Sequence, residues 1–344
     1  MTALTNETSR SPNYHKSVKI ISLIVLTLQN AILSLSMRYV RTQPGDMFYS
    51  STAVVMTEVV KCVSSLFLVY VTEALSIMHF FKIVYGTIIK QPIDTLKVCI
   101  PSIVYIIQNN LLYLASTHLD AATVQITYQL KVLTTAIFAV CLLRRSLGIH
   151  QWTSLVLLLV GVGLVQVADV KDQKLTTNIE QNRVIGMIAA LSACVLSGFA
   201  GIYFEKILKG SDISVWMRNV QLSIISVPAG LIHAYVEDWN NLMKNGFFFG
   251  YNYFVIYVIF LQAIGGLLVA IVVKYADNIL KGFATSLAII ISCIFSMYLF
   301  DFIINFQFVV GALFVIASVF LYGYPFPTKP KYLAKEKVQN GSYV

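Results

Sequence analysis

The feature that most constrains this chain is a series of apolar segments, each about twenty residues long and bounded by charged residues, Pro or Asn. A helix of that length crosses the hydrocarbon core of a bilayer, which is about 30 Å thick. A composition that is 57% hydrophobic and only 12% charged excludes a soluble globular domain. The sequence therefore predicts an all-α polytopic membrane protein with ten transmembrane helices, near 18–40, 47–72, 96–117, 120–142, 149–168, 183–207, 213–236, 252–275, 277–299 and 303–324.

The distribution of Lys and Arg predicts the orientation of these helices. With the N-terminus placed in the cytosol, 16 of the 25 basic residues fall on the cytosolic side and 6 on the opposite side, and the remaining ones lie inside segments. Cytosolic loops of membrane proteins carry such an excess of Lys and Arg. We therefore expect both termini in the cytosol. The same excess explains the net charge of +9 without nucleic acid as a partner.

The two halves of the chain are related by a weak internal repeat. At an offset of 150 residues, Lys131 matches Lys281 and Gly161 matches Gly311. A unit of five spans reverses its orientation when it is repeated, which gives the inverted topology typical of secondary transporters. We therefore expect two inverted five-helix repeats, with the chain divided into a cytosolic tail (1–17), a first repeat (18–168), a linker (169–182), a second repeat (183–324) and a cytosolic tail (325–344).

Two lysines within the predicted spans indicate the kind of solute. A charge at the centre of a bilayer costs about 3 kcal/mol or more, so it normally faces a cavity or a partner. Lys131 and Lys281 are expected at equivalent places near the midplane, where two cations would suit a diphosphate. Lys281 could instead pair with Asp277, one turn earlier on the same helical face. Lys131 has no acid within four residues. The sequence thus predicts a carrier of an anionic solute.

Other polar residues in the spans have both a structural and a functional interpretation. Glu58 and Lys61 are three residues apart and can neutralise one another, or they can line the pocket. Gln108 and Asn109 offer amides that could recognise a pyrimidine edge or a sugar, or could form a hydrogen-bonded cluster between helices. The cysteines and histidines show no metal-ligand or disulfide spacing, and no ATP-binding loop or catalytic cluster is present, so we expect neither metal, cofactor nor enzyme activity.

From Lys19 to Tyr324 the chain resembles the nucleotide-sugar transporters of the drug/metabolite transporter superfamily. The resemblance is closest to the UDP-galactose transporters, then to those of UDP-N-acetylglucosamine, and then to those of CMP-sialic acid. The motifs that carry it are Glu58 with Lys61, PSIVYIIQNNLLYLA from Pro101, LDAATVQITYQLK ending at Lys131, SGFAGIYFEKILKG from Ser197, Val215 to Gln221, and VVKYADNILKGFATSLAII from Val272.

The resemblance implies a Golgi antiporter, with some protein in the endoplasmic reticulum, that imports UDP-galactose in exchange for UMP and supplies glycosyltransferases. UDP-GalNAc and UDP-GlcNAc are further cargo candidates, and Golgi glycosyltransferases or a second copy of the chain are candidate partners beside the lipid bilayer. Val124 and Ser223 depart from tyrosines of related transporters, which complicates the transfer of specificity. The substrate-binding residues implied by the family pattern are Lys131, Lys281, Asn109, Gln108, Tyr128, Glu58, Lys61, Ser197, Gly198, Gly201 and Asn219.

Three alternatives remain open at this stage. One is a non-transporting scaffold or accessory subunit, for which the buried lysines would be an unexplained cost. The cargo could be another nucleotide sugar, such as UDP-GlcNAc or CMP-sialic acid, which competition in an uptake assay would reveal. The protein could also be an integral membrane glycosyltransferase, which would need a cluster of carboxylates or histidines at a rim of the membrane domain. We find no such cluster in the sequence.

Overall fold

The computed structural model describes residues 12–42, 48–119, 124, 127–169, 182–300 and 306–324. All regular secondary structure in these ranges is helical, which confirms the all-α prediction. The elements are α1 (Pro12–Thr42), α2 (Ser50–Val69), the π-helical turn η1 (Tyr70–Ala74), α3 (Ile77–Ile88), α4 (Pro92–His118), α6 (Lys131–Leu143), α7 (Ile149–Asp169), α8 (Arg183–Lys209), α9 (Val215–Asn245), α10 (Tyr253–Tyr275), α11 (Asn278–Phe300) and α12 (Phe306–Gly323).

Helices of membrane-spanning length dominate the described ranges. Among those residues, 7 helical stretches are long and apolar enough to cross a bilayer. They fall in α1, in α2 with η1, and in α8 to α12. The chain is therefore a polytopic membrane protein. The predicted segment 183–207 coincides closely with α8, whereas α9 continues to Asn245, well beyond the end predicted at 236.

The fourth predicted segment differs from the structure. The sequence predicts one helix over 120–142, but α6 begins only at Lys131 and has 13 residues, about 20 Å of helix. Gln129 and Leu130 form a turn before it, in which the Leu130 N–H donates to the Thr127 carbonyl at 3.1 Å. Irregular backbone at membrane depth occurs where it is buried in protein or lines a cavity. Lys131 therefore occupies the first residue of a helix beside such a break.

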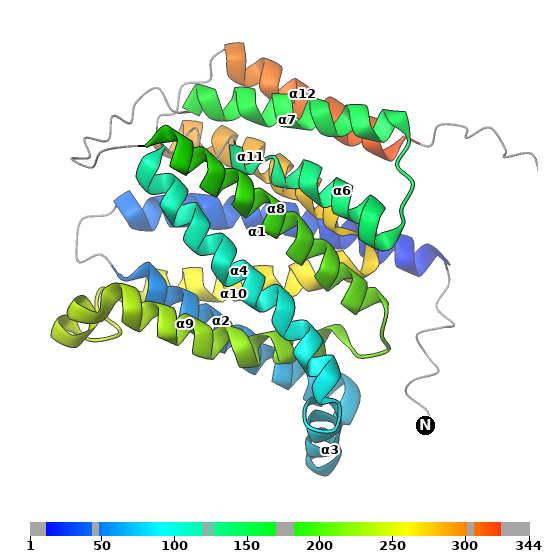
Figure 1. Cartoon of the computed structure of the whole chain (residues 1–344), viewed down its shortest axis with the longest axis vertical. Coiled ribbons are helices and arrows are strands. Elements are labelled where there is room, and N and C mark those ends of the chain that lie inside the picture. Colours follow the sequence, from blue (N-terminus) through cyan, green and yellow to red (C-terminus); the bar gives the residue numbers. More distant parts are fainter. Residues whose placement is uncertain are drawn as a thin grey trace, which may run out of the picture.

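The long helices lie side by side in the order shown in Figure 1, with α7 and α12 packed together at one edge of the bundle and α2 and α9 together near the other. Helix α4 runs along α8 between these edges. The largest buried apolar cluster joins α6, α7, α11 and α12, and it includes Leu155, Phe283 and Val315. The α7–α12 contact is close because Gly161 and Gly311 face each other.

A Cβ atom added at Gly161 would lie 2.8 Å from the Gly311 carbonyl oxygen, and one added at Gly311 would lie 2.7 Å from the Gly161 carbonyl oxygen. Real Cβ atoms do not approach backbone oxygen so closely, so both glycines are needed for this helix contact. A second pair with the same offset of 150 also meets, because Gly282 of α11 faces the Val132 side chain of α6. Two pairs of residues at matching positions in the halves of the chain are thus in contact.

Helix α3 is an element that the sequence analysis did not identify. Leu75 takes a left-handed conformation (φ 54°) after η1, and α3 follows directly. Its 12 residues are too few to cross a bilayer. In Figure 1, α3 lies across the direction of the long helices at one corner of the bundle, where the chain passes from α2 to α4. An apolar stretch of this length carries no membrane-spanning signal, so the sequence predicts only a connection between the spans 47–72 and 96–117.

Candidate functional site

A hydrogen-bond network joins α4 and α8 through Tyr128, which lies at the break before α6. The Gln108 side-chain amide of α4 donates to the Tyr128 hydroxyl at 2.8 Å. The Tyr128 hydroxyl in turn donates to Ser197 Oγ of α8 at 3.3 Å. Gln108 is buried, whereas Tyr128 and Ser197 are half-buried. Three of the residues predicted for the site are therefore brought together by direct contacts.

Lys131 extends this network to a cation. Its Nζ atom lies 4.2 Å from the centroid of the Tyr128 ring, which places the ammonium group over the aromatic face. Such contacts contribute roughly 0.5–2 kcal/mol and hold a cation without neutralising it. Within the described part of the chain, Lys131 forms no ion pair. The Lys131 charge is therefore positioned but not compensated.

Lys281 lies near Lys131. The residues next to each lysine, Val132 and Gly282, are in contact, and the two ammonium groups repel one another electrostatically. Both lysines are half-buried, and Lys281 likewise forms no ion pair with any acid that the structure describes. Two neighbouring cations in a membrane interior are unfavourable unless an anion occupies the space between them.

The alternative in which Lys281 pairs with Asp277 is not the arrangement in the structure. One Asp277 oxygen lies 3.3 Å from Nη1 of Arg145, and the other accepts a hydrogen bond from the Leu280 N–H at 2.7 Å. The Asp277 carboxylate thus caps the start of α11 and faces an arginine from the connection after α6. A carboxylate just before the first turn of a helix commonly accepts hydrogen bonds from the backbone N–H groups of that turn. This capping competes with an ion pair between the same carboxylate and a lysine one turn later.

Glu58 and Lys61 form the predicted pair with each other. Lys61 Nζ lies 2.6 Å from a Glu58 carboxylate oxygen, and both side chains are largely buried. The Lys61 side chain lies against Gly266 of α10. In the ranges that the structure describes, no hydrogen bond or ion pair joins this pair to the network of Gln108, Tyr128 and Ser197. The pair is a neutral unit between α2 and α10.

The remaining predicted site residues have individual environments. A Cβ at Gly198 would meet Thr134 Oγ1 at 2.5 Å and the Thr135 nitrogen at 2.8 Å, so this glycine allows close packing of α8 on α6. Gly201 similarly accommodates the Asn278 side chain of α11. Asn219 is buried, and its amide donates to the Val215 carbonyl of its own helix at 3.0 Å. Asn109 lies on α4, but its side chain falls outside the described residues.

A charged cluster that the sequence analysis did not single out lies beside the start of α11. Glu205 of α8 is 0% exposed, and its carboxylate accepts hydrogen bonds from Arg145 at 2.7 Å and from Lys209 at 2.8 Å. It also accepts from the Asn278 N–H at 3.0 Å. Glu205 is the only acid in the predicted span 183–207. Because a charge within a membrane span is costly, the presence of an acid in this apolar segment was the sequence signal that could have identified Glu205.

A second cluster joins α4 to α9. Arg218 lies within the predicted span 213–236, is 0% exposed and donates to both oxygens of Asp94, at 2.5 and 3.1 Å. Gln221 also donates to the Asp94 carboxylate, at 3.4 Å. Asp94 lies in the first turn of α4, ahead of the predicted span. The hydrogen bond from Arg218 holds the pKa of the Asp94 carboxyl below its ordinary value.

The chemistry of the central residues is that of binding rather than bond breaking. Hydroxyl and amide groups can recognise a sugar or a base, and the two ammonium groups can hold phosphate oxygens. Among the described residues, no group of His, Cys, Asp or Glu side chains is arranged to hold a metal ion. The site is suited to a solute with both an anionic part and a hydrogen-bonding part.

Comparison with known proteins identifies the kind of solute carrier that this chain resembles. The family model for nucleotide-sugar transporters matches residues 14–323. A UDP-galactose translocator of Homo sapiens is 49% identical over 311 residues, which cover 90% of this chain and 78% of the relative. A UDP-N-acetylglucosamine transporter of Mus musculus is 49% identical over 315 residues, covering 90% of this chain and 96% of the relative.

The UDP-galactose translocator of Bos taurus is similar to the same extent, at 48% identity over 93% of this chain and 81% of the relative. A solved crystal structure of a protein has the same fold with a TM-score of 0.62, although only 10% of its sequence is identical. The structural match covers 89% of this chain and 98% of the other. It supports the arrangement of the helices alone.

Proposed function

Because the chain belongs to the nucleotide-sugar transporter family, we propose that its cargo is a UDP-sugar, with UDP-galactose as the first candidate. The protein is a transporter and not an enzyme. UDP-galactose translocators from cattle and humans are similar to it over at least 90% of its length. In this proposal the carrier imports the sugar nucleotide into the Golgi lumen and returns UMP.

The observation that carries the proposal is the pair of ammonium groups of Lys131 and Lys281. They repel one another, and in the described residues neither forms an ion pair with an acid, since the buried Glu205 attracts Lys281 without pairing with it. A bound diphosphate would relieve that repulsion, and UMP would do so in part. Tyr128, Gln108 and Ser197 then offer groups for the uridine or the sugar. An empty carrier that must move two unpaired cations across its cycle reorients slowly, which favours exchange over net transport.

Alternating access is the mechanism we infer. Ten spans in two inverted five-helix repeats would let the halves rock around a central site. The contacts of Gly161 with Gly311 and of Val132 with Gly282 support this proposal, because residues that an axis relates can meet only near that axis. The break before α6 supports the location of the site, since interrupted helices in transporters carry the binding groups. Cytosolic termini follow from the excess of basic residues on that side.

Uptake into liposomes tests this function directly. The purified protein, reconstituted into vesicles loaded with UMP, is expected to take up labelled UDP-galactose much faster than vesicles without internal nucleotide. Equal uptake from both kinds of vesicle would contradict exchange. Lys131→Gln and Lys281→Gln should each reduce uptake at least tenfold, because loss of one charged contact with phosphate removes about 1.5–3 kcal/mol. Lys244→Gln, at the end of α9, serves as the control and should retain full uptake.

UDP-N-acetylglucosamine is the second candidate cargo, because transporters of that solute are as similar to this chain as the galactose translocators are. The two sugars differ in stereochemistry at one carbon and in an N-acetyl group, which the network around Tyr128 could contact. Competition distinguishes them. Unlabelled UDP-galactose, UDP-N-acetylglucosamine and CMP-sialic acid are each added to the uptake assay with labelled UDP-galactose. The true cargo should suppress uptake at a lower concentration than the other two compounds do. Equal suppression by all of them would contradict a selective site.

A further inference from the structure

Helix α3 has three distinct faces, which follow from about 100° of rotation per residue. One face packs against the protein. It carries Phe80, Ile83, Val84 and Ile88, which lie against Val69 of α2 and against Met217 and Val220 of α9. This contact fixes the orientation of the helix about its own axis, so the other two faces point away from the bundle in a defined way.

The second face is apolar and has no partner in the described part of the chain. It spans about 120° of the helix circumference and consists of large side chains with high exposure. Met78 is 84% exposed and Phe81 is 64% exposed. The full set of exposed apolar residues on this face is Ile77, Met78, Phe81, Tyr85 and, at the end of the helix, Ile89.

The third face is polar and lies beside the apolar one. It carries Lys82, His79 and Gly86, and Lys90 follows at the C-terminal end. Both lysines are exposed. Lys90 Nζ lies 5.9 Å from the Tyr85 ring, so the ammonium group is at the boundary between the apolar and polar faces. A helix with one apolar and one cationic exposed face is amphipathic in the way that membrane-surface helices are.

Neither water nor the bilayer core alone suits both exposed faces. Five large apolar side chains on one arc would be unfavourable in water, and Lys82 with Lys90 would be unfavourable in hydrocarbon. Exposed apolar side chains also occur on the preceding candidate span formed by α2 and η1, where Val63, Phe67 and Val71 are exposed. The boundary between hydrocarbon and headgroups is the environment that satisfies both.

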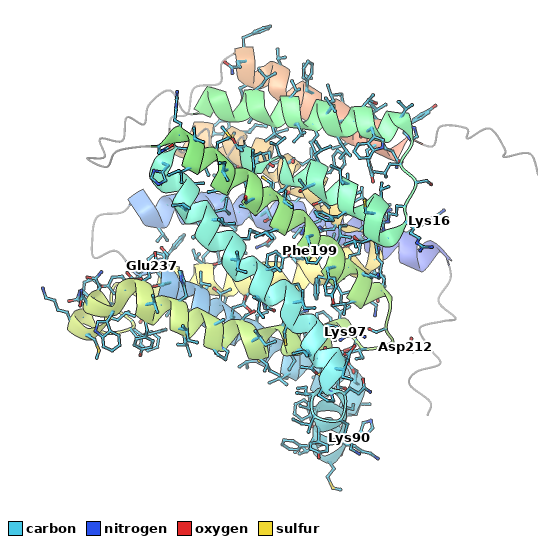
Figure 2. All side chains as sticks on the ribbon, viewed as in Figure 1. Lys16, Lys90, Lys97, Phe199, Asp212 and Glu237 are labelled. Atoms are coloured by element: carbon cyan, nitrogen blue, oxygen red, sulfur yellow. The ribbon has the colours of Figure 1, made fainter. Side chains whose placement is uncertain are left out.

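The position of α3 in the bundle agrees with that environment. It lies across the direction of the long helices, and so roughly parallel to the membrane plane (Figure 1). In Figure 2, Lys90 lies at this corner, and Lys97 and Asp212 lie toward the end of the bundle that carries Lys16. Glu237 lies at the opposite end. Helix α3 is therefore placed on the side of the membrane that receives the start of α1.

We propose that α3 is an interfacial helix that inserts its Phe81 face into the lipid and binds anionic lipid headgroups through Lys82 and Lys90. Tyr85 lies between these regions, as aromatic residues do at membrane interfaces. The occupant of the exposed face is thus the surface of the bilayer. This inference depends on the membrane location of the chain and not on the identity of the transported sugar.

Site-directed fluorescence tests the lipid contact. In a variant without the native cysteines Cys62, Cys99, Cys141, Cys194 and Cys293 that retains nucleotide-sugar uptake, a fluorophore is attached to Phe81→Cys or to His79→Cys. The protein is reconstituted into vesicles of phosphatidylcholine and phosphatidylserine. A nitroxide on the lipid acyl chain is expected to quench the label at 81 several-fold more than the label at 79. Iodide in the water should quench in the reverse order.

Two results would overturn the insertion of this face. Strong quenching at 81 by iodide would place the face in water. Protection at 81 from both iodide and lipid nitroxides would mean that protein, such as a second copy of the chain, covers it. Energy transfer between labels on two copies would identify the second copy.

Headgroup recognition is tested with the same label. Nitroxide-labelled phosphatidylserine should quench at 81 more than labelled phosphatidylcholine, because each lysine near an anionic surface favours binding about fivefold. In Lys82→Gln with Lys90→Gln this preference should fall to near unity, whereas Lys244→Gln should keep it. A preference that persists in the double variant would overturn the role of the two lysines.

Discussion

Replacement of Glu205 by Gln is expected to destabilise the protein substantially. The Glu205 carboxylate is fully buried and accepts hydrogen bonds from Arg145, Lys209 and the Asn278 N–H. Gln has the same shape but offers one acceptor oxygen and an amide that only donates. At least one of the three donors would therefore face another donor, and Arg145 and Lys209 would lose their shared negative partner.

The expected loss can be estimated from these contacts. Each charge-assisted hydrogen bond contributes about 1.5–3 kcal/mol. The Arg145 and Lys209 side chains are 28% and 30% exposed, so water compensates part of what they lose. A loss of about 2–4 kcal/mol in the free energy of unfolding is therefore expected, a large fraction of the roughly 5–15 kcal/mol that stabilises a typical folded protein.

The assay is thermal unfolding of the purified protein in detergent, compared with the same substitution at Glu237. Glu237 pairs with His233 at 2.7 Å, but its side chain is 45% exposed, and it lies at the opposite end of the bundle (Figure 2). Glu237→Gln should change the unfolding free energy by less than about 1 kcal/mol, as exposed pairs usually do. Equal melting curves for Glu205→Gln and Glu237→Gln would refute the reasoning, because Glu205 differs from Glu237 both in its burial and in the number of donors that its carboxylate accepts from.

Three further predictions concern other contacts. Tyr128→Leu should raise the KM for uptake more than Tyr128→Phe, because only Leu removes the ring beneath the Lys131 ammonium; equal KM values would contradict this. Gly161→Val should lower the melting temperature and the yield of folded protein, since its side chain would strike the α12 backbone, whereas Gly86→Val, where space is open, should not lower it by steric clash. The pKa of Asp94 is lowered in the folded protein, so the ionised carboxylate stabilises the fold fully above the ordinary carboxyl pKa of about 4, and this stabilisation is lost as the pH falls through the lowered pKa. Melting temperatures measured from about pH 6 to about pH 2 should therefore fall more steeply at acid pH in wild type than in Asp94→Asn.

Much of the helical architecture follows from apolar length alone. The segments predicted at 183–207 and 252–275 agree with α8 and α10, because an uninterrupted apolar stretch leaves the backbone few alternatives in lipid. The break before α6 could not be predicted in this way. Polar residues such as Thr127, Tyr128 and Gln129 precede Lys131, but their contacts and that of Thr134 with α4 and α8 form only in three dimensions.

The candidate site was predictable where a charge had no local partner. Lys131 stands out in the sequence for that reason, and the structure gives it a cation–π contact with Tyr128 and no acid in the described residues. The environment of Lys281 was not predictable, because Asp277 is close in sequence but contacts Arg145 from another part of the chain. The ion pair of Arg218 was not predictable for a related reason, since its partner Asp94 is 124 residues away.

The contact between Gly161 and Gly311 restricts how this chain can change over evolutionary time. A side chain at either position would clash with the backbone of the opposite helix. In most protein cores, such a clash can be relieved by a second substitution that puts a smaller residue on the opposite helix. Here the residue on the other side is already glycine, so no second substitution at that position can restore the space. Any tolerated change would require the two helix axes to separate, which couples this one contact to the spacing of the whole edge formed by α7 and α12.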